Sequence, residues 1–395
     1  MRLLFLTCHL PSPPVSGGRL RERELLRRLS ACAEVHLCAI TKTYEDDVAA
    51  GDGLRDVCAS VSVFEAQPGT DDLPIQARRH CSPAAALHVR RLLHEVDLVH
   101  VEGFYLMHHL PRSCETPLLL AEQNVEYSLW SQRVAIAGGH AQQRDAFRDF
   151  RETRGWEVAA WRRADLCAAV TEEDRATMLR VAPELDVRVV PDGVDHLGGP
   201  PPGRREPQRE VLLVGNFAYQ PNADAALWFC GEILPRLRRC VPDAQVLLVG
   251  NAPPPEVRAL ACEHVEVTGR VVSVEPYLDR AAVVVSPLRV GGGIKVKVLE
   301  ALCRGKAIVS TTVGVQGLGP GVEGTIEVAD RPERFAEACA VLLLDAGARR
   351  RLERRAVALA ATLPTWDEAA ERLLACYREL ALAPTLVDAE GAELR

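Results

Sequence analysis

The residues best suited to bind an anion lie in one segment, residues 286–310, which reads SPLRVGGGIKVKVLEALCRGKAIVS. Three consecutive glycines, Gly291, Gly292 and Gly293, separate a predicted strand that ends at Pro287 from a predicted helix over 295–304. Glycines let the backbone approach a ligand closely, and the first turn of a helix offers unpaired N–H groups to an anion. The pattern indicates a phosphate site, although a plain glycine-rich turn with a solvated basic rim would look the same.

Charged side chains surround this turn. Only four lysines occur in the chain, and two of them, Lys295 and Lys297, stand here beside Arg289. Lysines two positions apart point to different sides of a helix, so we expect one to reach a phosphate while the other faces solvent. Glu300 follows about two turns into the helix, at a depth suited to the hydroxyls of a sugar whose phosphate lies at the helix N-terminus.

The elements that must position this turn form two similar series. Apolar runs alternate with helical patterns in both halves, which is typical of parallel, doubly wound α/β sheets. In the first half, strands are predicted at 3–7, 34–40, 61–64, 98–101, 118–121, 166–170 and 187–190, with a long helical stretch over 128–163. In the second half, strands are predicted at 211–215, 245–250, 265–268, 282–287 and 307–311, with helices at 223–239 and 274–278.

A Gly/Pro-rich segment, 198–209, separates the two series and reads as a linker. We therefore predict domains over 1–200 and 206–363, followed by an amphipathic helix over 364–382. Ligands of doubly wound sheets bind at the carboxyl ends of the strands, so two such domains are expected to share a central cleft.

Composition excludes several classes of protein. Apolar residues make up 48% of the 395 residues, charged residues 26%, and the formal net charge is −7. These values argue against a disordered chain and against a general nucleic-acid binder. The 13 cysteines are scattered without a CxxC pair, which indicates free thiols in a reducing compartment. No apolar stretch approaches the 18 residues of a membrane span, and the N-terminal apolar run is too short for a signal peptide.

The segment 286–310 resembles the donor-binding motif of retaining GT-B glycosyltransferases of family 4 (glycosyl transferases group 1). Further segments resemble family motifs in the expected order: PSPPVSGGRLRERELLRRL from Pro11, DLVHVEG from Asp97, AEQNVE from Ala121, WRRADLCAAVTEEDRATM from Trp161, VVPDGVD from Val189, VGNFAYQPNADAALWF from Val214 and VTGRV from Val267. The resemblance implies an α/β, GT-B fold with an acceptor-binding N-terminal domain, a nucleotide-sugar-binding C-terminal domain, and a last helix that returns to the N-terminal domain.

The resemblance also implies roles for individual residues. Glu300 would hold the ribose and the glycine turn the diphosphate of a nucleotide. The donor-binding residues implied are Gly17, Gly18, Asn216, Arg270, Arg289, Gly292, Gly293, Ile294, Lys295, Lys297, Leu299 and Glu300. Asn124 and Glu126 are expected to bind the acceptor, and Glu102, His100 and Lys297 are the catalytic candidates.

The sequence departs from the family pattern at three places. A second glutamate of many relatives is replaced by Gly292, the loop from Asn216 carries no cation, and Gln123 stands where a histidine is usual. Neutralisation of a pyrophosphate would therefore fall on Lys295, Lys297, Arg289 and the helix dipole. A strand-end histidine such as His100 is also explained by a structural role, and the same alternative stands for Glu102.

These observations predict a cytoplasmic, retaining hexosyltransferase that moves a sugar from a nucleotide-diphosphate sugar to an acceptor hydroxyl, in natural-product or cell-surface glycan biosynthesis. No cofactor is expected, and no metal, because Asp46–Asp47 and Asp71–Asp72 do not form a DxD motif. Membrane association is not predicted, although the arginine-rich segment 19–28 leaves it open as a minority alternative. Other readings are a GT-B epimerase or phosphorylase, or a non-catalytic nucleotide-sugar-binding subunit that supports a partner enzyme.

Overall fold

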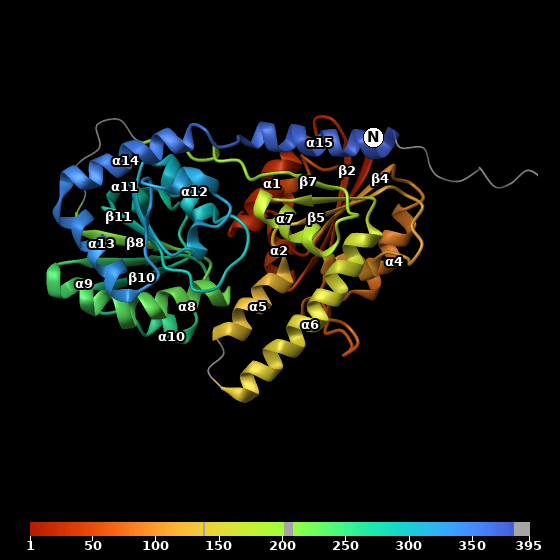
Figure 1. Ribbon diagram of the computed structural model, residues 1–395. Coiled ribbons are helices and arrows are strands. Elements are labelled where there is room, and N and C mark those ends of the chain that lie inside the picture. Colours follow the sequence, from red (N-terminus) through yellow and green to blue (C-terminus); the bar gives the residue numbers. More distant parts are fainter. Residues whose placement is uncertain (137–138, 201–207, 383–395) are drawn as a thin grey trace, which may run out of the picture.

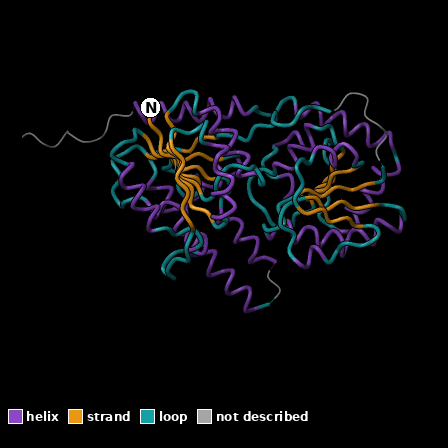
Figure 2. The backbone as a smooth tube through the Cα atoms, turned by 180° about the vertical axis from the view of Figure 1, so that it is seen from behind, coloured by secondary structure: helices purple, strands orange, loops and turns teal. Residues whose placement is uncertain are grey.

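A computed structural model describes residues 1–136, 139–200 and 208–382. Two parallel sheets, each enclosed by helices, form the two halves of the molecule (Figure 1, Figure 2). The expected α/β, GT-B architecture with two Rossmann-like sheets is confirmed. The proposed domain boundary near residue 205 lies outside the described residues.

The N-terminal sheet has seven strands in the order β3-β2-β1-β4-β5-β6-β7. Its strands are β1 (Arg2–Thr7), β2 (Glu34–Thr41), β3 (Ser60–Glu65), β4 (Leu98–Glu102), β5 (Leu118–Glu122), β6 (Leu166–Ala169) and β7 (Val187–Val189). All its pairs are parallel, with Leu3 of β1 opposite Val35 of β2 on one side and Leu98 of β4 on the other. The central strands are buried on both faces, which explains why they read as nearly continuous apolar runs.

The C-terminal sheet has six parallel strands in the order β10-β9-β8-β11-β12-β13. They are β8 (Glu210–Val214), β9 (Gln245–Val249), β10 (Val265–Gly269), β11 (Val283–Ser286), β12 (Ala307–Ser310) and β13 (Glu327–Val328). In both sheets the strand order reverses beside the first strand, between β1 and β4 and between β8 and β11. Such switch points open a crevice at the carboxyl ends of the strands.

Helices cover both sheets. Those of the N-terminal half are α1 (Gly17–Leu29), α2 (Tyr44–Ala50), α3 (Ile75–Arg78), α4 (Pro83–Leu92), α5 (Glu126–Ile136), α6 (His140–Arg163) and α7 (Glu172–Val181). Those of the C-terminal half are α8 (Gln220–Trp228), α9 (Leu234–Cys240), α10 (Pro255–Arg258), α11 (Glu275–Arg280), α12 (Val296–Cys303), α13 (Pro332–Leu344) and α14 (Ala346–Ala360). Short 3-10 turns link several of them, at η1 (Gly51–Leu54), η2 (Phe104–His109), η4 (Val313–Val315) and η5 (Gly319–Val322).

Two predicted helices are more complex than expected. The stretch 128–163 forms two helices, α5 and α6, which pack side by side and extend away from the N-terminal sheet (Figure 1). The stretch 223–239 is interrupted by a π-helical segment, η3 (Phe229–Ile233), between α8 and α9.

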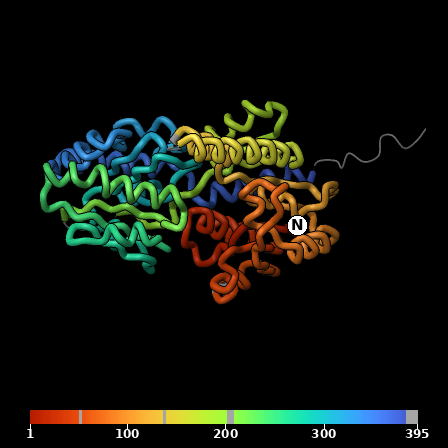
Figure 3. The backbone as a smooth tube through the Cα atoms, turned by 90° about the horizontal axis from the view of Figure 1, so that it is seen from below, coloured from red at the N-terminus to blue at the C-terminus, as the bar shows by residue number. Residues whose placement is uncertain are grey.

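The last helix, α15 (Trp366–Leu382), crosses back over the N-terminal half, while α13 and α14 stay with the C-terminal half (Figure 1, Figure 3). Its buried side chains, among them Trp366, Leu373 and Tyr377, join the core formed by α1 and the central strands β1 and β4. The chain thus passes between the halves twice, once after β7 and once before α15.

Candidate functional site

The glycine turn lies at the start of α12, directly after β11. Gly293 adopts φ +59°, a left-handed conformation that glycine adopts without steric cost. Lys295 precedes the first helical residue and folds back over the turn, where its Nζ donates to the carbonyl oxygens of Gly292 (3.0 Å) and Gly293 (2.6 Å). The lysine therefore braces the loop that was predicted to receive phosphate.

Lys297 points to the other side of α12. Its Nζ donates to Asn222 Oδ1 of α8 at 2.6 Å. Burial is the main reason that the pKa of Lys295 falls to about 7 and that of Lys297 to about 8; Lys297 also lowers the pKa of Lys295, and Glu300 raises that of Lys297. The expectation that one of the two lysines faces solvent is wrong, because the turn encloses one amine and α8 covers the other.

Glu300 lies one turn after Lys297 on α12, with a side chain that is 15% exposed. Its Oε1 lies 3.3 Å from Nε2 of His196, in the segment after β7. Arg289 does not reach the turn. It forms an ion pair with Asp224 of α8, which raises the pKa of the guanidinium, and lies 5.8 Å over the Trp228 ring.

The remaining donor candidates occupy different environments. Asn216 follows β8 and caps its own loop, with Oδ1 accepting from the backbone N–H of Ala218 at 3.2 Å. Arg270 is exposed after β10. Ile294 is half-buried, and Leu299 is 1% exposed within the core of the C-terminal half, so only its backbone could meet a ligand.

The glycines of the site are crowded by neighbouring groups, which belong to the other half at Gly293 and Gly17 and to the same half at Gly18. A Cβ at Gly293 would lie 2.5 Å from the carbonyl oxygen of Gln123 and 2.7 Å from Asn124 Oδ1, and one at Gly18 would lie 2.6 Å from Gln123 Oε1. A Cβ at Gly17 would meet Val296 of α12 at 3.0 Å. The sequence alone assigned these glycines to a ligand, but the chain itself already approaches them closely.

A reciprocal pair of hydrogen bonds adds to this junction. Gln132 of α5 donates through Nε2 to the Gly291 carbonyl at 3.0 Å and accepts at Oε1 from the Gly291 N–H at 3.0 Å. Beside it, a Cβ at Gly292 would lie 3.1 Å from Leu129. The N-terminal half therefore holds the glycine turn from the loop after β5 and from α5.

The two catalytic candidates of the N-terminal half lie beneath the surface. His100 is fully buried, with Nδ1 at 2.6 Å from the Tyr377 hydroxyl of α15 and Nε2 at 2.9 Å from Glu102 Oε1. Its ring stacks on Phe5. Burial raises the pKa of Glu102, but the hydrogen bond and charge of His100 outweigh it and hold that pKa below its ordinary value. This pair lies at the carboxyl end of β4, beside the switch point of the N-terminal sheet.

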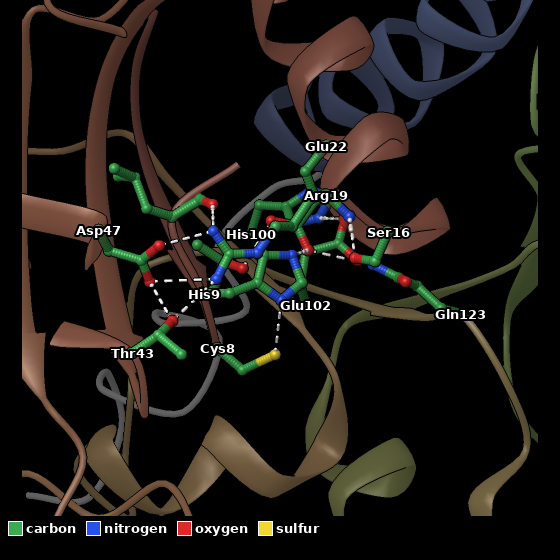
Figure 4. A network of polar contacts seen from close by, with 12 residues as sticks. Cys8, His9, Ser16, Arg19, Glu22, Thr43, Asp47, His100, Glu102 and Gln123 are labelled. Atoms are coloured by element: carbon green, nitrogen blue, oxygen red, sulfur yellow. Dashed lines mark hydrogen bonds and ion pairs between the residues drawn. The ribbon is translucent and has the colours of Figure 1, made fainter. Parts of the chain in front are cut away.

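A polar network connects this pair to Gln123, Glu22 and His9 (Figure 4). Gln123 Nε2 lies 3.1 Å from both Glu102 Oε2 and Glu22 Oε1. Glu22 is fully buried and also accepts from the Thr7 hydroxyl at 2.6 Å. The replacement of the usual histidine by Gln123 thus supplies an amide that bridges two carboxylates.

His9 is a site residue that the sequence reasoning missed. Its Nε2 lies 3.0 Å from Glu22 Oε1 and its Nδ1 lies 3.3 Å from Cys8 Sγ, while Cε1 would lie 3.5 Å from a Cβ at Gly18. Burial lowers the pKa of His9, but the Glu22 carboxylate holds it well above its ordinary value. The position of His9 in the sequence could have indicated it, since His9 lies two residues after the carboxyl end of β1, at the switch point.

The two acceptor candidates lie close together. Asn124 lies against Gly292 and Gly293 at the junction of the halves. Glu126 begins α5, where its Oε2 lies 3.4 Å from Gln76 Nε2. Burial raises the pKa of the Glu126 carboxyl, and hydrogen bonds from Gln76 and Asn124 oppose this rise. Asn124 thus contacts both the turn expected to bind the donor and the second acceptor candidate.

Two features missing from the described residues bear on partners. Within 1–136, 139–200 and 208–382, no group of three or more His, Cys, Asp and Glu side chains is arranged to hold a metal ion. In the same ranges, none of the helices has the length and apolar character needed to cross a bilayer. A hollow of about 220 Å³ lies elsewhere, between α13 and α14, and none of the candidate site residues lines it.

Comparison with known proteins agrees with the architecture. Residues 208–345 match the family model of the glycosyl transferases group 1. An uncharacterized 44.6 kDa protein of the cps region of Klebsiella pneumoniae is 24% identical over 136 residues, which are 32% of this chain and only 35% of that protein.

Solved structures match over nearly the whole chain. Sucrose-phosphate synthase of Thermosynechococcus elongatus is 19% identical, with a TM-score of 0.68 over 96% of this chain and 99% of that one. HepE of Anabaena, in complex with UDP and glucose, is 16% identical, with a TM-score of 0.67 over 96% and 100%. WaaG, a glycosyltransferase involved in lipopolysaccharide biosynthesis, is 14% identical, with a TM-score of 0.65 over 94% and 98%. The chain therefore has the GT-B fold, and residues 208–345 are similar to the glycosyl transferases group 1.

Proposed function

We propose that this protein is a glycosyltransferase that moves a sugar from a nucleotide-diphosphate sugar to an acceptor hydroxyl with retention of anomeric configuration. The single observation that carries the proposal is the arrangement at the start of α12. There a glycine turn, Lys297 and Glu300 present in order a backbone anion site, a cation and a carboxylate. These groups match the diphosphate and the ribose of a nucleotide.

The donor would lie with its diphosphate over the turn and its ribose beside Glu300. Lys295 shapes the turn through two carbonyl oxygens and Lys297 stands within the same helix turn, so both place positive charge near the leaving phosphate. Negative charge develops on that phosphate as the glycosidic bond breaks. Stabilising it with fixed groups is the main way in which such a site lowers the barrier.

The N-terminal crevice would orient the acceptor and the sugar. In a retaining reaction on one face of the sugar, the acceptor oxygen forms the new bond on the side from which the phosphate departs, and the phosphate oxygen takes the acceptor proton. Gly17, Gly18 and Asn124 lie at the junction where the two substrates would meet. Glu102 and His100 would support this surface from below through Gln123.

The finer parts of this proposal are based on the sequence and on the structural neighbours. HepE was solved with UDP-glucose, which makes UDP-sugars the first donors to try. A hexose as the transferred sugar, a natural-product or cell-surface glycan as acceptor, and a cytoplasmic location are parts of the same proposal. Metal-independent transfer is a further part, and its test is retention of the full rate in excess EDTA.

A non-catalytic nucleotide-sugar-binding subunit is the second candidate. Two features favour it, namely Gly292 in place of a second glutamate and the Arg289–Asp224 ion pair, which draws one cation away from the turn. Such a protein would bind the donor without consuming it.

One experiment separates the two candidates. A panel of UDP-, GDP-, ADP- and TDP-sugars is first screened by thermal shift, since a ligand at 100 times its Kd adds about 2.7 kcal/mol to the free energy of unfolding. Donor hydrolysis by the best ligand is then followed by NMR, which reports the anomer released. Binding without turnover would favour the subunit, an inverted product would exclude retention, and the absence of any binding would overturn both.

A further inference from the structure

The two passages of the chain between the halves lie against each other. The Val194 N–H donates to the Pro364 carbonyl at 3.1 Å, and the Trp366 N–H donates to Asp195 Oδ1 at 2.7 Å. A Cβ at Gly193 would lie 2.3 Å from the Trp366 nitrogen, so only glycine permits this approach. The segment 193–196 and the start of α15 therefore form one structural unit.

His196 connects this unit to α12. Its Nδ1 lies 3.3 Å from Trp366 Nε1, and its Nε2 lies 3.3 Å from Glu300 Oε1. The imidazole side chain is 8% exposed. One ring thus touches the second passage of the chain with one nitrogen and the proposed ribose ligand with the other.

The chemistry of the partners determines which nitrogen carries the proton. An indole N–H only donates, so Nδ1 must accept and the proton of the neutral imidazole resides on Nε2. Nε2 then donates to Glu300, a carboxylate that only accepts. This chain of donors fixes the orientation of Glu300 through Oε1 and leaves Oε2 to accept from a ligand.

We propose that His196 is a positioning residue for the donor ribose, which holds Glu300 in its binding orientation and ties that orientation to the two passages between the halves. The inference rests on the proposed function, because it takes the ligand of Glu300 to be the hydroxyl pair of a nucleoside diphosphate. Its specificity is therefore for the sugar hydroxyls and not for the phosphates.

Two substitutions of His196 separate its two hydrogen bonds. His196→Asn keeps an oxygen near the position of Nδ1, able to accept from Trp366, but is too short to reach Glu300. His196→Gln places an amide near the position of Nε2, able to donate to Glu300, but gives up the acceptor for Trp366. The two variants are close in size and polarity, so each is the control for the other.

The test measures affinity by calorimetry for three probes. They are the ribonucleoside diphosphate that stabilises the wild-type protein most among UDP, GDP and ADP, its 2′,3′-dideoxy analogue, and inorganic pyrophosphate. We expect His196→Asn to weaken binding of the nucleoside diphosphate about tenfold, the loss of one charge-assisted hydrogen bond, and His196→Gln to stay within about threefold. Both variants should bind the dideoxy analogue and pyrophosphate as the wild type does.

The outcomes are distinguishable. A merely structural role for His196 would weaken all three probes together, and would overturn the inference. Equal affinity of His196→Asn and wild type for the nucleoside diphosphate would overturn it as well, while leaving the proposed function intact. Failure of the wild-type protein to bind UDP, GDP, ADP and also TDP would overturn the proposed function and the inference with it. Unfolding temperatures of the ligand-free variants verify that both are folded.

Discussion

The two halves share one architecture but offer opposite chemistry at the same topological position. At the switch point of the N-terminal sheet, the carboxylates Glu22 and Glu102 are buried and bridged by an amide. At that of the C-terminal sheet, the cations Lys295 and Lys297 are enclosed and their pKa values are lowered. The comparison shows that the fold provides the crevice and that the side chains of each half decide which substrate group it can receive.

The carboxylates of the N-terminal half and the lysines of the C-terminal half also differ in their bonding partners. The carboxylates of Glu22 and Glu102 are hydrogen-bonded to neighbours in the N-terminal half, so they can hold the side chains above them in place. The hydrogen bonds of the two lysines go to uncharged groups, the carbonyls of Gly292 and Gly293 and the amide of Asn222. The carboxylates Asp174 and Glu300 act on Lys295 and Lys297 only through space, and they do not offset the effect of burial. A cation that is not hydrogen-bonded to an anion gains much from an anionic ligand.

The largest effect is expected from Glu102→Ala. Glu102 is fully buried and accepts hydrogen bonds from His100 and Gln123, and its removal leaves both donors without this acceptor, which costs about 1–3 kcal/mol each in the free energy of unfolding. Urea denaturation measures the loss, and Glu102→Gln, which keeps an acceptor for His100 and loses the charge, should lose less. An alanine variant that is as stable as the wild type but has no turnover would show that Glu102 acts in the reaction and does not only support the fold.

The next effect is expected in the C-terminal half. Lys297→Ala should lower the single-turnover rate at saturating donor about 100-fold, since a fixed group that stabilises developing charge contributes this much. Lys295→Ala should lower it less, because Lys295 Nζ already serves two carbonyl oxygens of the turn. Rapid-quench measurements on both variants decide the order, and equal or reversed losses would show that the wrong lysine was chosen.

A smaller loss is expected for Glu300→Ala. The variant removes a charge-assisted hydrogen bond to the ribose, worth about 1.5–3 kcal/mol, so the Kd for the nucleoside diphosphate should rise about tenfold or more. Calorimetry gives the constant, and Glu327→Ala on β13 is a matched surface control, exposed on the C-terminal sheet away from α12. An unchanged Kd in Glu300→Ala would contradict the ribose assignment.

The smallest effect is expected in the number of protons that the protein takes up when a diphosphate binds. The lowered pKa values of Lys295, about 7, and Lys297, about 8, leave these amines partly neutral above neutral pH. A bound diphosphate raises both values, so binding at pH 8 should take up a fraction of a proton, and this uptake should vanish near pH 6, where both amines are already charged. Calorimetry in buffers of different ionisation enthalpy measures it, and a heat independent of the buffer would mean that the lysines are charged before the ligand arrives.

How far the sequence predicts the molecule depends on how local the determinants are. The glycine turn and α12 depend on neighbouring residues, so residues 286–310 alone predicted the strand–turn–helix, whereas the role of the turn in binding a donor stays a prediction. The helical stretch over 128–163 is confirmed, but its division into α5 and α6 was not predicted, because helical periodicity continues on both sides of the break.

The N-terminal network could not be seen in the sequence for a different reason. Glu22 meets residues 15 positions before it and 101 positions after it, and His100 meets Tyr377 at a separation of 277. Such contacts exist only once the strands are ordered in the sheet. The enclosure of Lys297 likewise depends on Asn222, 75 positions earlier, so spacing along α12 predicted its direction but not its burial.

The reciprocal hydrogen bonds between Gln132 and Gly291 have a kinetic consequence. Any motion that separates the halves far enough for a substrate to leave must first break both bonds and draw Leu129 away from Gly292. Each bond stabilises the closed arrangement by about 0.5–1.5 kcal/mol, which is enough to lengthen the lifetime of the closed state severalfold without strengthening any contact with the substrate. Gln132 would then slow the release of product. Its removal would raise the turnover rate most if bond formation is already fast and product release limits that rate.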